Sequence, residues 1–126
     1  MHQPGPRSEK LWRASQTVIP GGVNSPVRAF DAVGGQPVFV QQAKGAHVVG
    51  VDGQTYIDYI MSWGPMILGH ACDPVVTAAR DACCKGMSFG MPTEAECLLA
   101  ERITQCIPSV ESVRMVNSGT EAAMSA

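Results

Sequence analysis

The end of the sequence passes from a short apolar run into a polar turn and then into helix-forming residues. Residues 112–117 read SVRMVN, followed by Ser-Gly-Thr and then Glu-Ala-Ala-Met. Buried parallel strands tend to be short and almost wholly apolar, so we predict a strand over residues 112–117 that leads directly into a helix. Such a unit opens an α/β layer. Because so short a helix is not stable by itself, we expect further chain downstream.

The turn between this strand and helix has two possible uses. A helix N-terminus presents unpaired backbone N–H groups and the positive end of the helix dipole, and Gly119 would let an anion approach the main chain. A phosphate would fit there, with hydroxyl donors from Ser118 and Thr120. However, Ser118-Gly-Thr-Glu121 also matches a capping box. The pattern by itself favours the plain cap, because the turn lacks the lysine of a P-loop.

The first half of the chain predicts one helix and a small antiparallel sheet. Ser8 can cap a helix that must end at Pro20-Gly21-Gly22. A loop follows to about Gly35. Strands are predicted over residues 38–41, 46–51 and 55–60, and Asp52-Gly53 between the last two indicates a type I′ hairpin turn.

Two further helices are predicted before the final strand. The first has Asp73 as its cap and Pro74 as its first residue, and Gly86 ends it. The second begins at the capping box formed by Thr93 and Glu96, and Pro108 ends it. The expected fold class is therefore α/β, with an N-terminal helix or arm over residues 1–19, a loop and small antiparallel meander over 20–72, and helices with the strand–turn–helix unit over 73–126.

Composition excludes several classes of function. The 126 residues are 45% hydrophobic and 16% charged with a net charge of −2, so we expect a globular piece with a buried core and no nucleic-acid partner. The longest uncharged apolar stretch, residues 60–72, is broken by glycine and proline and is too short to span a membrane. The start carries no apolar signal segment, and we expect a cytoplasmic protein. Five cysteines without a CxxC pair predict neither a disulfide set nor a metal site.

Four segments together resemble a known family. They are GGVNSPVRAF (21–30), SWGPMILGH (62–70), SFGMPTEAE (88–96) and VRMVNSGTEAAMSA (113–126). They are similar, in order and over nearly all the chain from Leu11, to the N-terminal part of class III aminotransferase-like enzymes, which have the fold-type I architecture and use pyridoxal phosphate. NSPVRAF combined with SWGP is similar to the aminomutase members of that family.

The resemblance implies two sets of binding residues. The set for the phosphate of pyridoxal 5′-phosphate or pyridoxamine 5′-phosphate is Ser118, Gly119 and Thr120. The set for the substrate is Ser25 and Arg28 at its carboxylate and Trp63 at the pocket wall. Without the resemblance, Arg28 would be read as a solvated loop charge, Ser25 as part of a turn and Trp63 as a core aromatic residue. His70 is expected to be a hydrogen-bonded structural histidine with no catalytic role.

The reaction implied by the resemblance moves an amino group from C2 of glutamate 1-semialdehyde to C1, which gives the tetrapyrrole precursor 5-aminolevulinate. The family is homodimeric and relies on a catalytic lysine. None of the three lysines, Lys10, Lys44 and Lys85, matches it, so we assign no catalytic residue to this chain and expect it to be inactive alone. Two alternatives are a class III aminotransferase with another amino donor and a non-catalytic remnant that binds phosphate.

Overall fold

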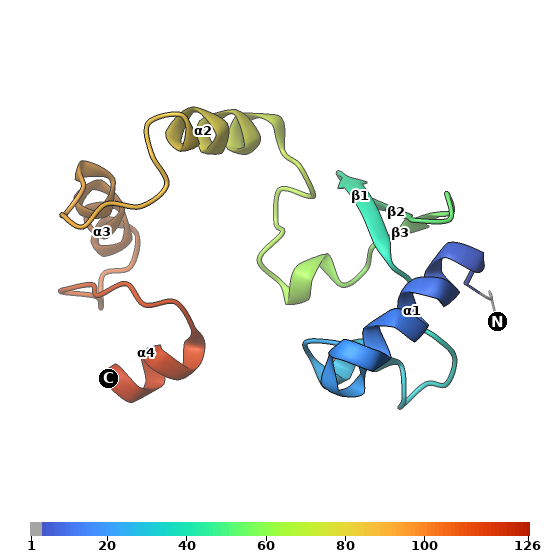
Figure 1. The fold of residues 1–126 in the computed structure, drawn as a ribbon. Helices are drawn as coiled ribbons and strands as arrows, with labels where there is room; N and C mark the ends of the chain where they lie inside the picture. Colours follow the sequence, from blue (N-terminus) through green and yellow to red (C-terminus); the bar gives the residue numbers. More distant parts are fainter. Residues whose placement is uncertain (1–3) are drawn as a thin grey trace. The chain divides into compact units, whose positions relative to one another are not determined.

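The structure, a computed structural model, describes residues 4–126 and divides into two compact units. These units are Met1–Asp81 and Ala82–Ala126, and the boundary lies within helix α2 (Asp73–Cys83) (Figure 1). The division of residues 1–126 into three segments made from the sequence stays a prediction.

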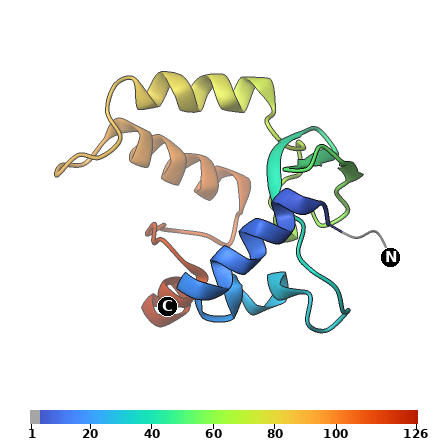
Figure 2. The same ribbon diagram turned by 45° about the vertical axis from the view of Figure 1, so that its right-hand side comes forward.

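The first unit consists of one helix, a three-stranded sheet and three short 3₁₀ turns. Helix α1 lies beside the sheet, as the two views in Figures 1 and 2 show. The elements in chain order are α1 (Pro6–Val18), η1 (Pro20–Gly22), η2 (Pro26–Ala29), β1 (Val40–Lys44), β2 (His47–Gly50), β3 (Thr55–Ile57) and η3 (Met61–Trp63), followed by the start of α2.

The sheet is the antiparallel meander predicted from the sequence. Its order is β1-β2-β3, with Lys44 opposite His47 in the first hairpin and Val49 opposite Thr55 in the second. The hairpin between β2 and β3 is confirmed, but the predicted type I′ turn at Asp52-Gly53 is wrong. The Gly53 amide bonds to the Gly50 carbonyl at 2.9 Å, and Gly53 alone in the turn has a positive φ, +88°. A type I′ turn needs two such residues.

The start of α1 also differs from the prediction. The helix begins at Pro6 after Gly5, so Ser8 lies inside the first turn and does not cap it. The cap comes instead from the hairpin turn: Asp52 Oδ1 accepts a hydrogen bond from the Arg7 amide (2.8 Å), and Asp52 Oδ2 accepts from the Ser8 amide (3.0 Å) and the Ser8 hydroxyl. Ser8 is only 3% exposed. A carboxylate distant in sequence therefore satisfies the free N–H groups of this helix.

Asp52→Ala is expected to speed hydrogen exchange of the Arg7 and Ser8 amides by roughly tenfold, because it removes the acceptor of both. The pKa of Asp52 is lowered from its ordinary value of 3.8, chiefly by the Ser8 hydroxyl. Protection should therefore be complete above pH 3.8 and disappear as the pH falls through the lower pKa of the folded state. Asp31→Ala, at an exposed aspartate, is the control. Equal exchange in both variants would contradict the capping role.

The second unit contains two helices joined by an extended segment. Helix α3 (Glu94–Cys106) begins as predicted, with the Glu96 carboxylate accepting from the Thr93 amide at 2.9 Å. Helix α4 (Gly119–Ser125) follows the predicted turn. The strand predicted over 112–117 does not form within residues 4–126. A parallel strand exists only when neighbouring strands accept and donate its backbone hydrogen bonds, and the described residues supply no such neighbour for this segment.

Most large apolar side chains of the described residues are exposed. Ala29, 6% exposed, is the one hydrophobic residue in the buried class, whereas Val75 on α2 is 54% exposed and Leu98 on α3 57%. The expectation of a buried core within this chain is therefore wrong, and neither α2 nor α3 has a residue in the buried class. No helix within that range is both long enough and apolar enough to cross a membrane.

Candidate functional site

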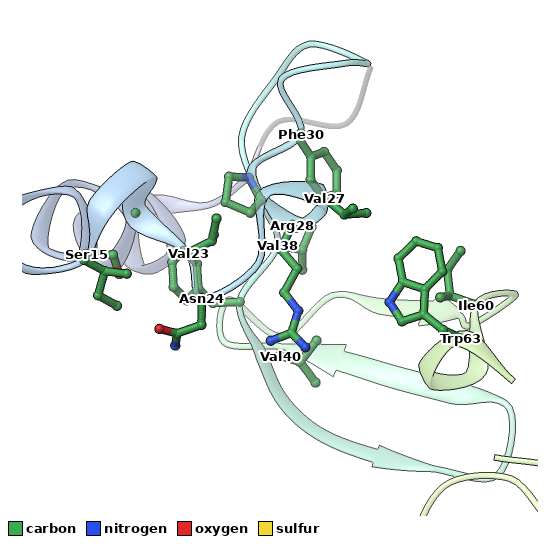
Figure 3. Close-up of a pocket in the computed structure, with 14 residues that line it drawn as sticks. Ser15, Val23, Asn24, Val27, Arg28, Phe30, Val38, Val40, Ile60 and Trp63 are labelled. Carbon is green, nitrogen blue, oxygen red and sulfur yellow. The ribbon is translucent and has the colours of Figure 1, made fainter. Parts of the chain in front are cut away.

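The first unit contains a cavity of about 550 Å³. It lies between the loop after α1, strand β1 and the turn η3 (Figure 3). Its wall is mostly apolar and is formed by Ser15, Ile19, Gly22, Val23, Asn24, Val27, Arg28, Phe30, Pro37, Val38, Phe39, Val40, Ile60 and Trp63. Such a wall, with few polar groups, is typical of a small-molecule site.

The loop that carries Arg28 is fixed by close packing against α1. At Gly22, with φ +73°, a Cβ atom would lie 2.5 Å from the Trp12 ring, so any larger residue would push the loop away from the helix. The chain then enters η2, where the Arg28 amide donates to the Ser25 carbonyl at 2.9 Å. Ala29 is buried, whereas its neighbour Arg28 is exposed and lines the cavity.

The Arg28 side chain extends into the cavity, as Figure 3 shows. Its guanidinium forms no ion pair or hydrogen bond with residues 4–126. An unpaired guanidinium beside apolar walls is a ready partner for a carboxylate, because its planar fork donates two parallel hydrogen bonds to the two oxygens. This part of the cavity can therefore bind and orient an anionic small molecule.

Trp63 reaches the cavity from a left-handed turn. Met61, Ser62 and Trp63 have φ values of +48°, +56° and +66°, and Gly64 follows at +116°. For residues other than glycine this conformation costs roughly 1–2 kcal/mol each, so three in succession require support from the surrounding structure. Backbone conformations of this kind are concentrated at functional sites.

Asp58 and His70 supply contacts that support this turn. Asp58 Oδ1 accepts hydrogen bonds from the amides of Ile60 (2.8 Å) and Met61 (3.0 Å), and Asp58 Oδ2 accepts from His70 Nε2 at 2.6 Å. The bond from His70, followed by those from the two amides, lowers the pKa of Asp58. The prediction of a hydrogen-bonded His70 is confirmed. Asp58 was missed, although an aspartate two residues before a turn is a known signal.

The turn before α4 forms the predicted cap. The Ser118 hydroxyl accepts from the Glu121 amide (3.2 Å) and donates to Glu121 Oε2 (3.1 Å), which also accepts from the Asn117 amide (2.9 Å). The amides of Gly119 and Thr120 have no acceptor among residues 4–126, and the space beside Gly119 is open. Two N–H groups therefore remain for an anion, whereas the Ser118 hydroxyl is already used by the cap.

The predicted site residues fall into two groups in the structure. Arg28 and Trp63 meet at one cavity, and Ser25 precedes η2 without lining it. Ser118, Gly119 and Thr120 belong to the second unit. Asn24 and Ile60 also line the cavity and were not singled out from the sequence. Within residues 4–126, no three His, Cys, Asp or Glu side chains gather closely enough to hold a metal ion.

The family of the chain follows from comparison with known proteins. The family model for aminotransferase class-III matches residues 30–126. The chain belongs to the class-III aminotransferase family. Among curated class-III relatives, the glutamate-1-semialdehyde 2,1-aminomutase of Rhodopirellula baltica is 57% identical over 97% of this chain. The chain spans only 28% of that relative's length.

Two solved structures resemble this chain in fold. An omega-transaminase from Sphaerobacter thermophilus matches 96% of this chain and 27% of its own, with a TM-score of 0.86 and 35% identity. A glutamate-1-semialdehyde-aminomutase variant from Pseudomonas aeruginosa, solved in complex with PMP, matches 79% of this chain and 22% of its own, with a TM-score of 0.69 and 26% identity. The predicted α/β fold and family are confirmed.

Proposed function

We propose that this chain is the substrate-recognising part of a pyridoxal-phosphate-dependent aminomutase that converts glutamate 1-semialdehyde to 5-aminolevulinate. The observation that carries the proposal is the Arg28 guanidinium, which has no partner among residues 4–126 and enters a mostly apolar cavity beside Trp63. This arrangement occurs in a chain that is 57% identical to a protein named as that aminomutase.

Arg28 would hold the carboxylate of the substrate, and Trp63 would cover its carbon chain. A carboxylate bound by two parallel hydrogen bonds cannot rotate freely, so the remainder of the molecule is directed along one path. The walls along that path are mostly apolar, with Trp63 itself 68% exposed. Ser25, at the start of η2, is proposed as a second contact to the carboxylate.

Gly119 and Thr120 are proposed to bind the phosphate of the cofactor through their amides, which have no acceptor among residues 4–126, with the Thr120 hydroxyl as a third donor. For Ser118 to donate as well, its hydroxyl would have to leave Glu121. The bound cofactor supplies an electron sink for the carbon from which a proton is removed. The residues of this chain would hold the phosphate and orient the substrate.

The whole enzyme is proposed to be a cytoplasmic homodimer, as the family resemblance implies. The exposed apolar residues on α2 and α3 are consistent with faces that are covered in the complete protein, because monomeric proteins rarely leave large apolar patches in water.

A class-III aminotransferase with another amino donor is a second candidate. It is favoured by the solved structures, since the omega-transaminase gives the higher TM-score, 0.86 against 0.69, and the higher identity, 35% against 26%. Both enzymes would need a phosphate site at Gly119 and Thr120. They differ in whether the amino group stays on the same carbon skeleton.

A chimera tests the proposal. Residues 1–126 would replace the matching segment of the Rhodopirellula baltica relative, and the product would be supplied with glutamate 1-semialdehyde and no external amino acceptor. Formation of 5-aminolevulinate at a rate near that of the unaltered relative is expected. Turnover only with an added amino acceptor would support the aminotransferase, and a folded chimera that binds the cofactor without either reaction would support a non-catalytic remnant.

Thr120→Ala in this chimera is expected to weaken binding of pyridoxal phosphate by about tenfold, because one hydrogen bond to a charged group is lost. Ser118→Ala should weaken it less, since the hydroxyl is shared with Glu121. Cofactor absorbance during equilibrium titration provides the measurement, and Ser112→Ala is the matched control. Equal affinities in all three variants would contradict the proposed phosphate site.

A further inference from the structure

We propose that Asp58 and His70 are positioning residues that hold Trp63 against the substrate cavity. Neither lines the cavity, and both act through the backbone between them. The inference rests on the proposed function in one respect: it takes the cavity to be the place where the substrate binds.

Both residues are anchored to the turn between β1 and β2. The His70 amide donates to the Gly45 carbonyl (2.9 Å) and the Gly45 amide to the His70 carbonyl (2.8 Å), while the Asp58 amide donates to the Ala46 carbonyl (2.8 Å). The backbones of Asp58 and His70 are thus attached to adjacent residues of one hairpin. Their side chains meet across the segment that contains Trp63.

The two oxygens of the Asp58 carboxylate accept hydrogen bonds from different partners. Oδ2 accepts from His70 Nε2, which fixes the orientation of the carboxylate, and Oδ1 then faces the amides of Ile60 and Met61. Each of the two side chains is 15% exposed, so water competes weakly for these bonds. Carboxylates with few water contacts form stronger hydrogen bonds than exposed ones.

Hydrogen bonds within the turn connect the residues held by Asp58 to Trp63 on the cavity wall. The Trp63 amide donates to the Ile60 carbonyl (3.0 Å) and the Gly64 amide to the Met61 carbonyl (3.2 Å). Ile60 and Trp63 are adjacent on the cavity wall (Figure 3). Because Met61, Ser62 and Trp63 are all held at positive φ, release of Asp58 would let the turn relax toward ordinary backbone angles, and the Trp63 ring would leave its place.

The first test is a kinetic cycle in the chimera. Asp58→Ala is expected to lower kcat/KM for glutamate 1-semialdehyde on the order of tenfold, mainly through KM, since binding geometry is lost while the chemistry is not. In a Trp63→Ala background the same change should have less than about a twofold effect, because residues that act through one another are not additive. Full additivity would overturn the proposal.

Conservative variants separate positioning from general folding. Asp58→Asn retains an oxygen for the two amides and should restore most of the affinity lost in Asp58→Ala. His70→Ala should imitate Asp58→Ala in part, and Asp31→Ala, at an exposed aspartate, should have no effect. If Asp58→Ala fails to fold, His70→Ala still forms a cycle with Trp63→Ala. Full additivity of His70→Ala and Trp63→Ala would then overturn the proposal.

A ¹⁹F NMR measurement that needs no substrate tests the positioning role separately from the proposed function. In the chimera labelled with 5-fluorotryptophan, the ¹⁹F resonance of Trp63 is assigned by its loss in Trp63→Phe. Asp58→Ala and His70→Ala should shift this resonance, and Asp31→Ala should not. A shift in a chimera that lacks aminomutase activity would refute the proposed function and support the positioning role. An unmoved resonance would refute the positioning role whatever the activity.

Discussion

Arg28→Ala is expected to reduce kcat/KM of the chimera for glutamate 1-semialdehyde on the order of 100-fold, because two charge-assisted hydrogen bonds to the carboxylate are lost. The guanidinium is unpaired among residues 4–126 and extends into the cavity. Its removal therefore frees no partner side chain that could bind the carboxylate in its place. Most of the loss should be in KM, since the carboxylate is held equally in the ground state and the transition state. Steady-state kinetics measure both constants.

Two comparisons make the Arg28 result specific. Arg28→Lys retains the charge but not the planar fork. Its affinity for the substrate should fall by more than half, but by less than in Arg28→Ala. Arg80→Ala is the matched control, because Arg80 lies exposed on α2 and, within residues 4–126, pairs only with its neighbour Asp81, at 3.8 Å. An unchanged KM in Arg28→Ala would show that the carboxylate is bound elsewhere.

The 126 residues alone are expected to form no detectable 5-aminolevulinate, even with saturating cofactor. Lys44 is held by the Asp73 carboxylate and the Ala71 carbonyl, while Lys10 lies on α1 and Lys85 follows α2. None lines the cavity that contains Arg28. The reaction requires an amine that reaches the cofactor, and none of these three lysines matches the lysine segment that the resemblance implies.

The activity of the isolated chain is measured by incubating it with glutamate 1-semialdehyde and quantifying the product by mass spectrometry. The chimera serves as the positive control under the same conditions. Product formed by the purified 126-residue chain above the rate of the cofactor in solution would refute the prediction. A triple variant with Lys10, Lys44 and Lys85 changed to arginine would then identify whether one of these lysines is responsible.

Local signals in the sequence predicted most elements of the fold. The capping pair at Thr93 and Glu96 and the breaks after Val18 and Cys106 depend on neighbouring residues, and such signals can be read directly. The cap of α1 could not be predicted in this way, because Asp52 lies more than forty residues from the helix it caps. The strand over 112–117 was predicted from its apolar residues, but a strand also requires partners that residues 4–126 do not contain.

The candidate site could be predicted only in part, because sequence patterns do not report contacts between residues that are distant along the chain. Resemblance identified Arg28 and Trp63, which the structure brings to one cavity. The cavity itself joins α1, η2, β1 and η3, and no pattern along the chain reports such an assembly. Asp58 was missed because its importance lies in two contacts made at once, to His70 and to the turn before Trp63. Each contact taken singly resembles an ordinary loop interaction.

The cap that Asp52 provides for α1 sets an order of events during synthesis and folding. Residues 6–18 leave the ribosome well before the hairpin turn that completes the helix. A helix of 13 residues is marginal in water without tertiary support, so its first turn should fray and reform until Val51 and Asp52 arrive. The Arg7 side chain, which donates to the Val51 carbonyl at 2.7 Å, would then join the two segments. Closure of this loop is therefore the step after which the first turn of α1 persists.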